Sequence, residues 1–157
     1  MSAPIVQRQP FVVPTTDGKL IEEHFGGASI GDAEVSIAHM ITPPRWSASH
    51  QNPAVDEYTL MVRGRKQVEV DGEVVVLSAG ESLLVRKGSR VRYANPFGEP
   101  AEYWSVCRPA FSPKTVTLPA DGLWRPRMRR RVVVFPDPLE PTRPKTEPSG
   151  TVRLTSL

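Results

Sequence analysis

The sequence predicts an all-β protein built as an antiparallel sandwich or barrel of short strands. Its 157 residues include 17 prolines, about twice the usual share, and proline interrupts helices because it lacks a backbone N–H. No segment keeps a helical period of apolar residues over three turns. Short apolar runs recur instead between glycine and proline turns, which is typical of small β domains.

Eight strands are predicted between residues 18 and 118, each rich in Val, Ile, Leu or Tyr. In order, they are Lys19–Phe25, Val35–Ile41, Glu57–Val62, Lys66–Val70, Val74–Leu77, Ser82–Val85, Arg90–Tyr93 and Ala101–Cys107. The clearest turn is Asp71-Gly72, because a two-residue hairpin loop needs positive φ, which glycine adopts easily. Since open sheet edges invite aggregation, we expect the strands to close into a barrel.

The positive charge of the chain is confined to its last segment. Residues 125–157 contain eight Lys/Arg and three Asp/Glu, a balance of +5. Residues 1–124 contain twelve Lys/Arg and fourteen Asp/Glu, a balance of −2, and the two balances sum to the net charge of +3. A mildly acidic body gives no electrostatic reason to expect a nucleic-acid partner.

Composition divides the chain into an N-terminal arm with the first strands (1–29), a strand-rich body (30–118) and a basic, proline-rich tail (119–157). We expect the tail to be extended or disordered, because charged, proline-rich segments seldom build a core. Two alternatives stay open: RPRMRRR (125–131) binds an anionic partner, or VVVF (132–135) adds an edge strand in a dimer. The abrupt change also suggests an extension that is not original to the domain.

The sequence favours a cytoplasmic protein. No apolar stretch approaches the roughly 18–20 residues that cross a bilayer, and the N-terminus lacks the apolar centre of a signal peptide. A single cysteine, Cys107, excludes an internal disulfide and fits a reducing compartment.

Two short motifs stand at a fixed spacing. In the first, six residues separate Glu57 from Gly64; in the second, Gly80 is followed by Gly88 and Asn95. Together, in this order on an all-strand chain, they resemble the cupin superfamily over roughly residues 30–112. The segments DEYTLMVRG, RKGSRVRYANP and AEYWSVCRPAFSP look like small single-domain bacterial cupins, distantly akin to ethanolamine-utilisation cupins. The resemblance implies a cupin-type antiparallel β-barrel, also called a double-stranded β-helix or jelly roll.

The metal motif of that family is degenerate here. Cupins hold a metal with three histidines and a glutamate, of which His50 and Glu57 match two. Asn52 and Val91 occupy the other two positions; valine cannot coordinate a metal, and an asparagine carbonyl is a poor ligand for transition metals. We therefore expect no certain cofactor, only a weakly bound divalent metal at His50 and Glu57. Residues that could rescue the site are Gln51, His39, Tyr93 and Cys107.

Glu57 is the main candidate for chemistry. In the cupin register it faces the interior together with Thr59 and Met61, because alternate residues of a strand share a face. A carboxylate among apolar neighbours should have a raised pKa unless it is paired, which suits general acid/base catalysis. The alternative is a carboxylate at a strand end that is solvated or paired with an arginine.

Other residues are candidates for the same pocket. His50 is either a proton carrier at the pocket mouth or an exposed loop histidine. Tyr93 either bonds a substrate oxygen or fills the core. Cys107 is expected to be a small buried residue, because no base is evident beside it. The expected substrate contacts are Gln51, Met61, Val91 and Cys107.

These observations support three functional hypotheses. The first is a small-molecule-binding cupin acting as an isomerase, lyase or cyclase, with Glu57 as acid/base and His50 and Tyr93 as polarising or proton-carrying groups. The alternative is a non-catalytic sensor or accessory protein with a vestigial metal site. Nucleic-acid binding through RPRMRRR is the least favoured. The expected partners are a small molecule in the barrel and a second copy of the chain in a homodimer, with no membrane.

Overall fold

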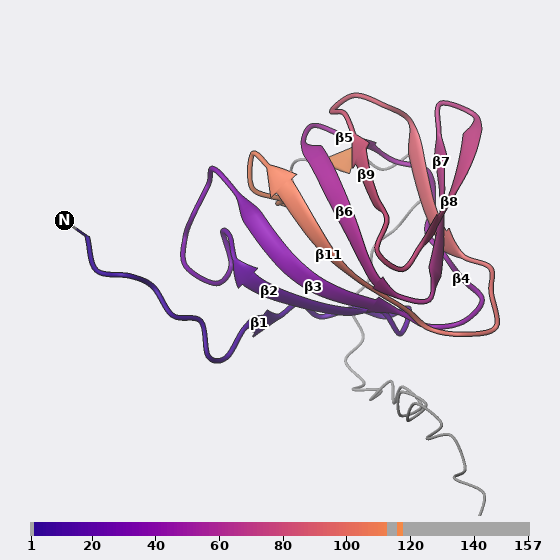
Figure 1. Ribbon diagram of the computed structural model, residues 1–157. Helices are drawn as coiled ribbons and strands as arrows, with labels where there is room; N and C mark the ends of the chain where they lie inside the picture. The colour runs from indigo at the N-terminus through magenta and orange to yellow at the C-terminus, as the bar shows by residue number, and fades with distance from the viewer. Residues whose placement is uncertain (1, 113–115, 118–157) are drawn as a thin grey trace, which may run out of the picture.

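The computed structural model describes residues 2–112 and 116–117 (Figure 1). Every regular element in these two ranges is a strand, which confirms the all-β prediction. The same residues contain no helix that is long and apolar enough to cross a bilayer. The predictions for RPRMRRR, VVVF and the remainder of the tail lie outside the described ranges.

The strands form three antiparallel sheets. The largest has the order β1 (Phe11–Val12), β2 (Leu20–Phe25), β3 (Ser36–Thr42), β11 (Ala101–Arg108), β6 (Asp56–Arg63) and β9 (Ser82–Val85). The second has the order β4 (Trp46–Ser47), β10 (Val91–Asn95), β7 (Arg65–Val70) and β8 (Glu73–Ser78). The third pairs β12 (Val116–Thr117) with β5 (Asn52–Pro53).

The predicted fold class is confirmed, with one difference in how the strands are joined. The two larger sheets form the layers of a sandwich, and no ladder of backbone hydrogen bonds among the described strands closes them into one barrel. Three of the four edges of the two larger sheets are short: β1 and β4 have two residues each and β9 has four, whereas β8 has six. Few backbone groups are therefore left unpaired at those edges.

All eight predicted strands are present, with ends within two residues of those expected. The hairpin at Asp71-Gly72 is also confirmed, because both residues have positive φ, 50° and 88°. The four additional strands, β1, β4, β5 and β12, have two residues each. Such short segments carry no periodic pattern, so they pair only where the tertiary structure brings them together.

Strand β6 shows how alternation divides each strand between core and surface. Thr59 and Met61 are buried, whereas Tyr58, Leu60 and Val62 are between 41% and 44% exposed. The predicted orientation of this strand is therefore confirmed. The buried side chains of both sheets meet in one core cluster of Trp46, Met61, Val68, Leu77, Val85, Val91, Tyr93, Ala101 and Tyr103.

The residues that end the two motifs hold the same loop, residues 96–100. Gly64 has φ of 73°, and a Cβ atom built there would lie 2.3 Å from the carbonyl oxygen of Pro100. Asn95 is fully buried; its Nδ2 donates to the carbonyls of Pro43 and Glu99 at 3.0 and 2.8 Å. The spacing of the motifs thus serves the backbone of the fold, independently of any ligand.

Replacing Gly64 by alanine should therefore destabilise the protein by about 2 to 4 kcal/mol, because the clash adds to the strain of positive φ. Gly80→Ala is the matched control, since Gly80 has φ of 84° and no atom within 4 Å of the added Cβ. That change should cost about 1 kcal/mol. Urea denaturation measures both, and equal losses for the two variants would contradict the role given to the close approach.

Candidate ligand-binding cavity

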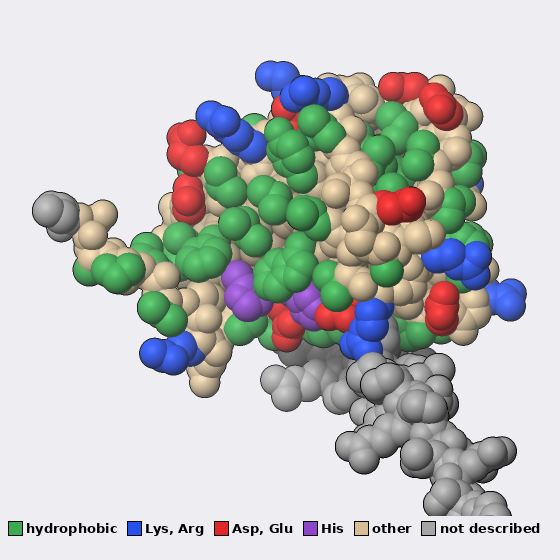
Figure 2. Space-filling view, in the orientation of Figure 1, with side chains coloured by type: hydrophobic (Ala, Val, Ile, Leu, Met, Phe, Trp, Pro, Cys, Tyr) green, Lys and Arg blue, Asp and Glu red, His purple; other side chains and the backbone are tan. Residues whose placement is uncertain are grey.

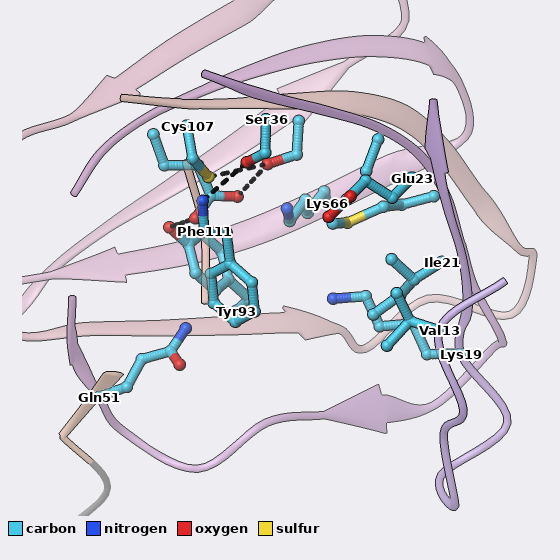
Figure 3. A pocket seen from close by; sticks show the side chains of 14 residues that line it. Val13, Lys19, Ile21, Glu23, Ser36, Gln51, Lys66, Tyr93, Cys107 and Phe111 are labelled. Atoms are coloured by element: carbon cyan, nitrogen blue, oxygen red, sulfur yellow. Dashed lines mark hydrogen bonds between the residues drawn. The ribbon is translucent and has the colours of Figure 1, made fainter. Parts of the chain in front are cut away.

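A cavity of about 150 Å³ lies between the two larger sheets. Its lining includes apolar groups, among them Ile21, Met40 and Phe111. The polar groups that line it come from both sheets and the segments between strands: Lys19, Glu23, Ser36, Gln51, Glu57, Lys66, Tyr93, Ser105 and Cys107. Figure 3 shows the amines of Lys19 and Lys66 and the amide of Gln51 directed into this space.

Glu57, near the start of β6, is held by two hydroxyl groups. The Tyr93 hydroxyl donates to its Oε2 at 2.7 Å, and the Ser105 hydroxyl donates to its Oε1 at 2.7 Å. Tyr93 lies on β10 and Ser105 on β11, so these hydrogen bonds connect the two sheets. Burial, and then the Glu57 carboxylate, raises the pKa of Tyr93 far above 10. The tyrosine therefore remains a hydrogen-bond donor at neutral pH.

Lys66 on β7 is the most deeply buried cation of the cavity, at 2% exposure. Its Nζ lies 3.6 Å from the centre of the Tyr103 ring and 4.3 Å from that of the Tyr93 ring. Within the described residues Nζ makes these cation–π contacts and donates no hydrogen bond. Burial lowers the pKa of Lys66 to about 7, although the Glu57 charge acts in the opposite direction.

Lys19 reaches the cavity from the segment before β2. Its Nζ lies 5.0 Å from the centre of the Trp46 ring, and Trp46 in turn donates from Nε1 to Asp17 at 2.7 Å. Burial lowers the pKa of Lys19, while Glu57 and Asp17 oppose the shift. The cavity thus contains two amines. The charge of Glu57 opposes the lowering of the pKa of both, and this carboxylate is already hydrogen-bonded by neutral hydroxyl groups.

Cys107 is buried, in agreement with its predicted environment. Its Sγ lies 3.8 Å from the Ser105 hydroxyl. Burial, followed by the Glu57 charge, raises the pKa of the thiol to about 12. Because the thiolate is the reactive form, this cysteine contributes a protonated, unreactive group to the cavity wall at neutral pH.

Four of the residues predicted from the sequence come together in the cavity: Glu57, Tyr93, Gln51 and Cys107. The two apolar residues predicted to contact the substrate, Met61 and Val91, are packed in the core cluster and are not part of the lining.

The structure does not bring His50 and Glu57 together, contrary to the predicted metal pair. His50 Nε2 lies 3.2 Å from Glu69 Oε1, and both side chains are partly exposed. Glu69 follows Val68 on β7, and alternation turns it away from the interior where Val68 is buried. His50 follows Glu69 to that outer side, so its predicted roles at the pocket mouth and as a metal ligand find no support in its position.

The proposed rescue ligand His39 also lies outside the cavity. It stands on the outer face of the large sheet, between Glu22 and Glu102, with 2.9 Å from a ring nitrogen to each carboxylate. Its ring packs against Trp104 at 5.2 Å between centres. Nowhere in residues 2–112 and 116–117 do three or more His, Cys, Asp or Glu side chains gather in a way that could hold a metal ion.

Five polar cavity residues escaped the sequence reasoning: Lys19, Glu23, Ser36, Lys66 and Ser105. A signal existed for Lys66, because alternation along RKQVEV places it on the same face as Val68 and Val70. Ser105 stands two residues before Cys107 and therefore shares its face. Lys19 begins a predicted strand, in which alternation places it on the same face as Ile21 and Glu23. Both of these residues line the cavity.

Replacing Lys66 by methionine should change how stability depends on pH. The pKa of Lys66 falls from 10.5 in the unfolded chain to about 7 in the folded protein, so the unfolded chain binds this proton more tightly. Wild-type stability therefore rises between about pH 7 and 10.5, and Lys66→Met lacks that rise. We expect the variant to exceed the wild type in free energy of unfolding by roughly 3 to 5 kcal/mol near pH 6.

This advantage should disappear toward pH 10.5, where the lysine is neutral in both states. Urea denaturation of the two proteins at pH 6, 8 and 10 measures the difference. A difference that stays constant over this range would contradict a lowered pKa for Lys66.

Comparison with known proteins agrees with this architecture. The family model described as "Cupin domain" matches residues 38–107. An RmlC-like cupin from Shewanella frigidimarina superposes with a TM-score of 0.57 at 17% identity, covering 70% of this chain and 93% of its own. The Streptomyces protein PAC13, in a structure with uridine, superposes with a TM-score of 0.59 at 12% identity, covering 74% of this chain and 90% of its own. At these identities the likeness concerns the fold.

Two curated relatives match in sequence. A Myxococcus xanthus protein named endoribonuclease YbeY is 41% identical over 107 residues, which are 68% of this chain and 36% of that protein. The tetracenomycin polyketide synthase protein TcmJ of Streptomyces glaucescens is 33% identical over 75 residues, 47% of this chain and 50% of that protein. The chain thus spans between about a third and a half of these relatives. Residues 38–107 thus match the cupin domain family, and the sandwich that contains them is similar in fold to solved cupins.

Proposed function

We propose that this protein binds a small organic molecule in the cavity between its sheets and that Glu57 transfers a proton to or from it. The observation that carries the proposal is a carboxylate with both oxygens held by the hydroxyl groups of Tyr93 and Ser105 at 2.7 Å. Such a carboxylate is fixed in orientation beside the cavity, as general acid/base catalysis requires. We place this activity in the cytoplasm, where the single thiol of Cys107 stays reduced.

An isomerase, lyase or cyclase reaction fits this arrangement best. These reactions move protons and need no external oxidant. The similarity to a protein named as part of a polyketide synthase supports a substrate with carbonyl groups, because a carbonyl acidifies the neighbouring C–H bond that a base would attack. The alternative is a non-catalytic binding protein that uses the same cavity to sense a ligand.

The relative named as an endoribonuclease does not lead us to propose RNA cleavage. The body of this chain, residues 1–124, carries a balance of −2, whereas nucleic-acid surfaces are basic. The match also covers only 36% of that relative.

Proton transfer can be tested with dihydroxyacetone, a hydroxyketone small enough for the cavity. Incubation in D₂O should incorporate deuterium at carbon faster with the protein than in buffer, as measured by NMR. Glu57→Gln should reduce this rate roughly 10²- to 10⁴-fold without a large loss of stability, since glutamine retains an acceptor for Tyr93. Glu69→Gln, on the outer side beside His50, is the matched control and should exchange at the wild-type rate.

A Glu57→Gln rate equal to that of the wild type would show that this carboxylate transfers no proton. Saturable binding of the hydroxyketone without any exchange would favour the sensor alternative.

We also propose that the protein forms a homodimer through the outer face of the six-stranded sheet. Tyr58, Leu60 and Val62 are exposed along β6. Figure 2 shows hydrophobic side chains gathered over this sheet, above the two histidines. Exposed apolar patches of this kind mark contact surfaces, and a second copy would present the same apolar face in return.

Leu60→Glu should convert the dimer to a monomer, because burying the new carboxylate at the interface is costly. Val76→Glu is the control: Val76 is similarly exposed but lies on β8 of the other sheet, and this variant should remain dimeric. Light scattering coupled to gel filtration gives the mass of each protein. A monomeric wild type, or dissociation of both variants alike, would refute this interface.

A further inference from the structure

We propose that Lys66 is a nucleophile whose Nζ captures the carbonyl carbon of a small aldehyde or ketone in the cavity. The inference deepens the proposed function and rests on it for the cavity as a binding site. It names the substrate class, carbonyl compounds, and the atom that binds them covalently.

The position of Lys66 leaves its amine accessible to a molecule in the cavity. The side chain is buried, its Nζ is directed into the cavity (Figure 3), and in the described part of the chain it donates no hydrogen bond. A lysine that only stabilised the fold would be expected to pair with a carboxylate or carbonyl oxygen. Among the described residues, the carboxylate whose charge acts on Lys66 is Glu57, and Tyr93 and Ser105 orient that carboxylate.

The same surroundings supply the neutral amine that the reaction needs. The rings of Tyr93 and Tyr103 cover Nζ and exclude water from one side, and burial lowers the pKa of the amine to about 7. The titratable groups that act on it or line the same cavity are Glu23 of β2, Glu57 of β6, Tyr93 of β10, Tyr103 and Cys107 of β11, and Lys19 before β2. At neutral pH an ordinary lysine of pKa about 10.4 has on the order of one amine in a thousand neutral, whereas about half of Lys66 is neutral.

The proposed step conserves atoms and electrons. The lone pair of Nζ forms a bond to the carbonyl carbon, the C=O π pair moves to oxygen, and proton transfers give a carbinolamine. Loss of water then gives an imine, with no oxidant or reductant. Glu57, in the same cavity, can exchange the protons that this sequence requires. With a β-diketone, the proton on the carbon between the imine and the remaining carbonyl then moves to nitrogen. The product is a conjugated enaminone, which is stable and absorbs in the near ultraviolet.

Pentane-2,4-dione is therefore the probe. With the wild type at pH 7.5 we expect a new near-ultraviolet absorbance and a mass increase equal to the diketone minus one water, located on Lys66 by peptide mapping. The initial rate should rise with pH and level off above about pH 7 to 8. Lys87→Met, which removes an exposed lysine outside the cavity, should react as the wild type does.

Lys66→Met should lose the absorbance, with initial rates at least about tenfold lower, because the surface lysines that remain are ordinary ones. Lys19, whose pKa burial also lowers, is not the proposed nucleophile. Lys66→Arg keeps the positive charge and should also lose the enaminone absorbance. Two variants guard against a folding defect in one of them, and circular dichroism verifies that both are folded. An adduct located on Lys19 or on surface lysines, or a rate that first rises near pH 10, would overturn the assignment. Deuterium exchange into dihydroxyacetone without any enaminone would refute only this inference, whereas an enaminone without exchange would refute only the role of Glu57.

Discussion

The hydrogen bond from the Tyr93 hydroxyl to the Glu57 carboxylate is the contact on which the cavity depends. It spans the sandwich from β10 to β6, and the Ser105 hydroxyl of β11 donates to the other oxygen of Glu57. Because neutral donors satisfy both oxygens, the carboxylate is oriented without a cationic partner in direct contact. The amines of Lys19 and Lys66 can therefore face the cavity instead of closing onto Glu57.

One charge, buried in this way, acts differently on each neighbour. Burial, and then the Glu57 carboxylate, raises the pKa of the Tyr93 hydroxyl and brings that of the Cys107 thiol to about 12. For Lys66, burial lowers the pKa to about 7, although the charge of Glu57 raises it. At neutral pH the tyrosine and the cysteine thus stay protonated, whereas the lysine exchanges its proton readily. Among these neighbours of Glu57, Lys66 is therefore the one that can lose its proton near neutral pH, as the proposed nucleophile must.

The two faces of the large sheet have different consequences for function. Its inner face supplies Glu57, Ser105 and Cys107 to the cavity. Its outer face holds the exposed apolar residues of β6 and the cluster in which His39 bridges Glu22 and Glu102. Since alternate residues point to opposite faces, a change at either face of β6 leaves the other chemically intact. Ligand chemistry and association with a second copy can therefore be tested separately.

The sequence alone determined the eight main strands, the Asp71-Gly72 hairpin and the inward orientation of Glu57, because these follow from alternation, turn chemistry and motif spacing. The tertiary structure decided which polar groups meet. His50 and Glu57 belong to the same family motif, yet His50 pairs with Glu69 on the outer side. Lys66 and Lys19 reach the cavity from strands and segments that no local pattern connects to Glu57. Such meetings depend on how two sheets pack across a core, and strand periodicity describes only one strand at a time.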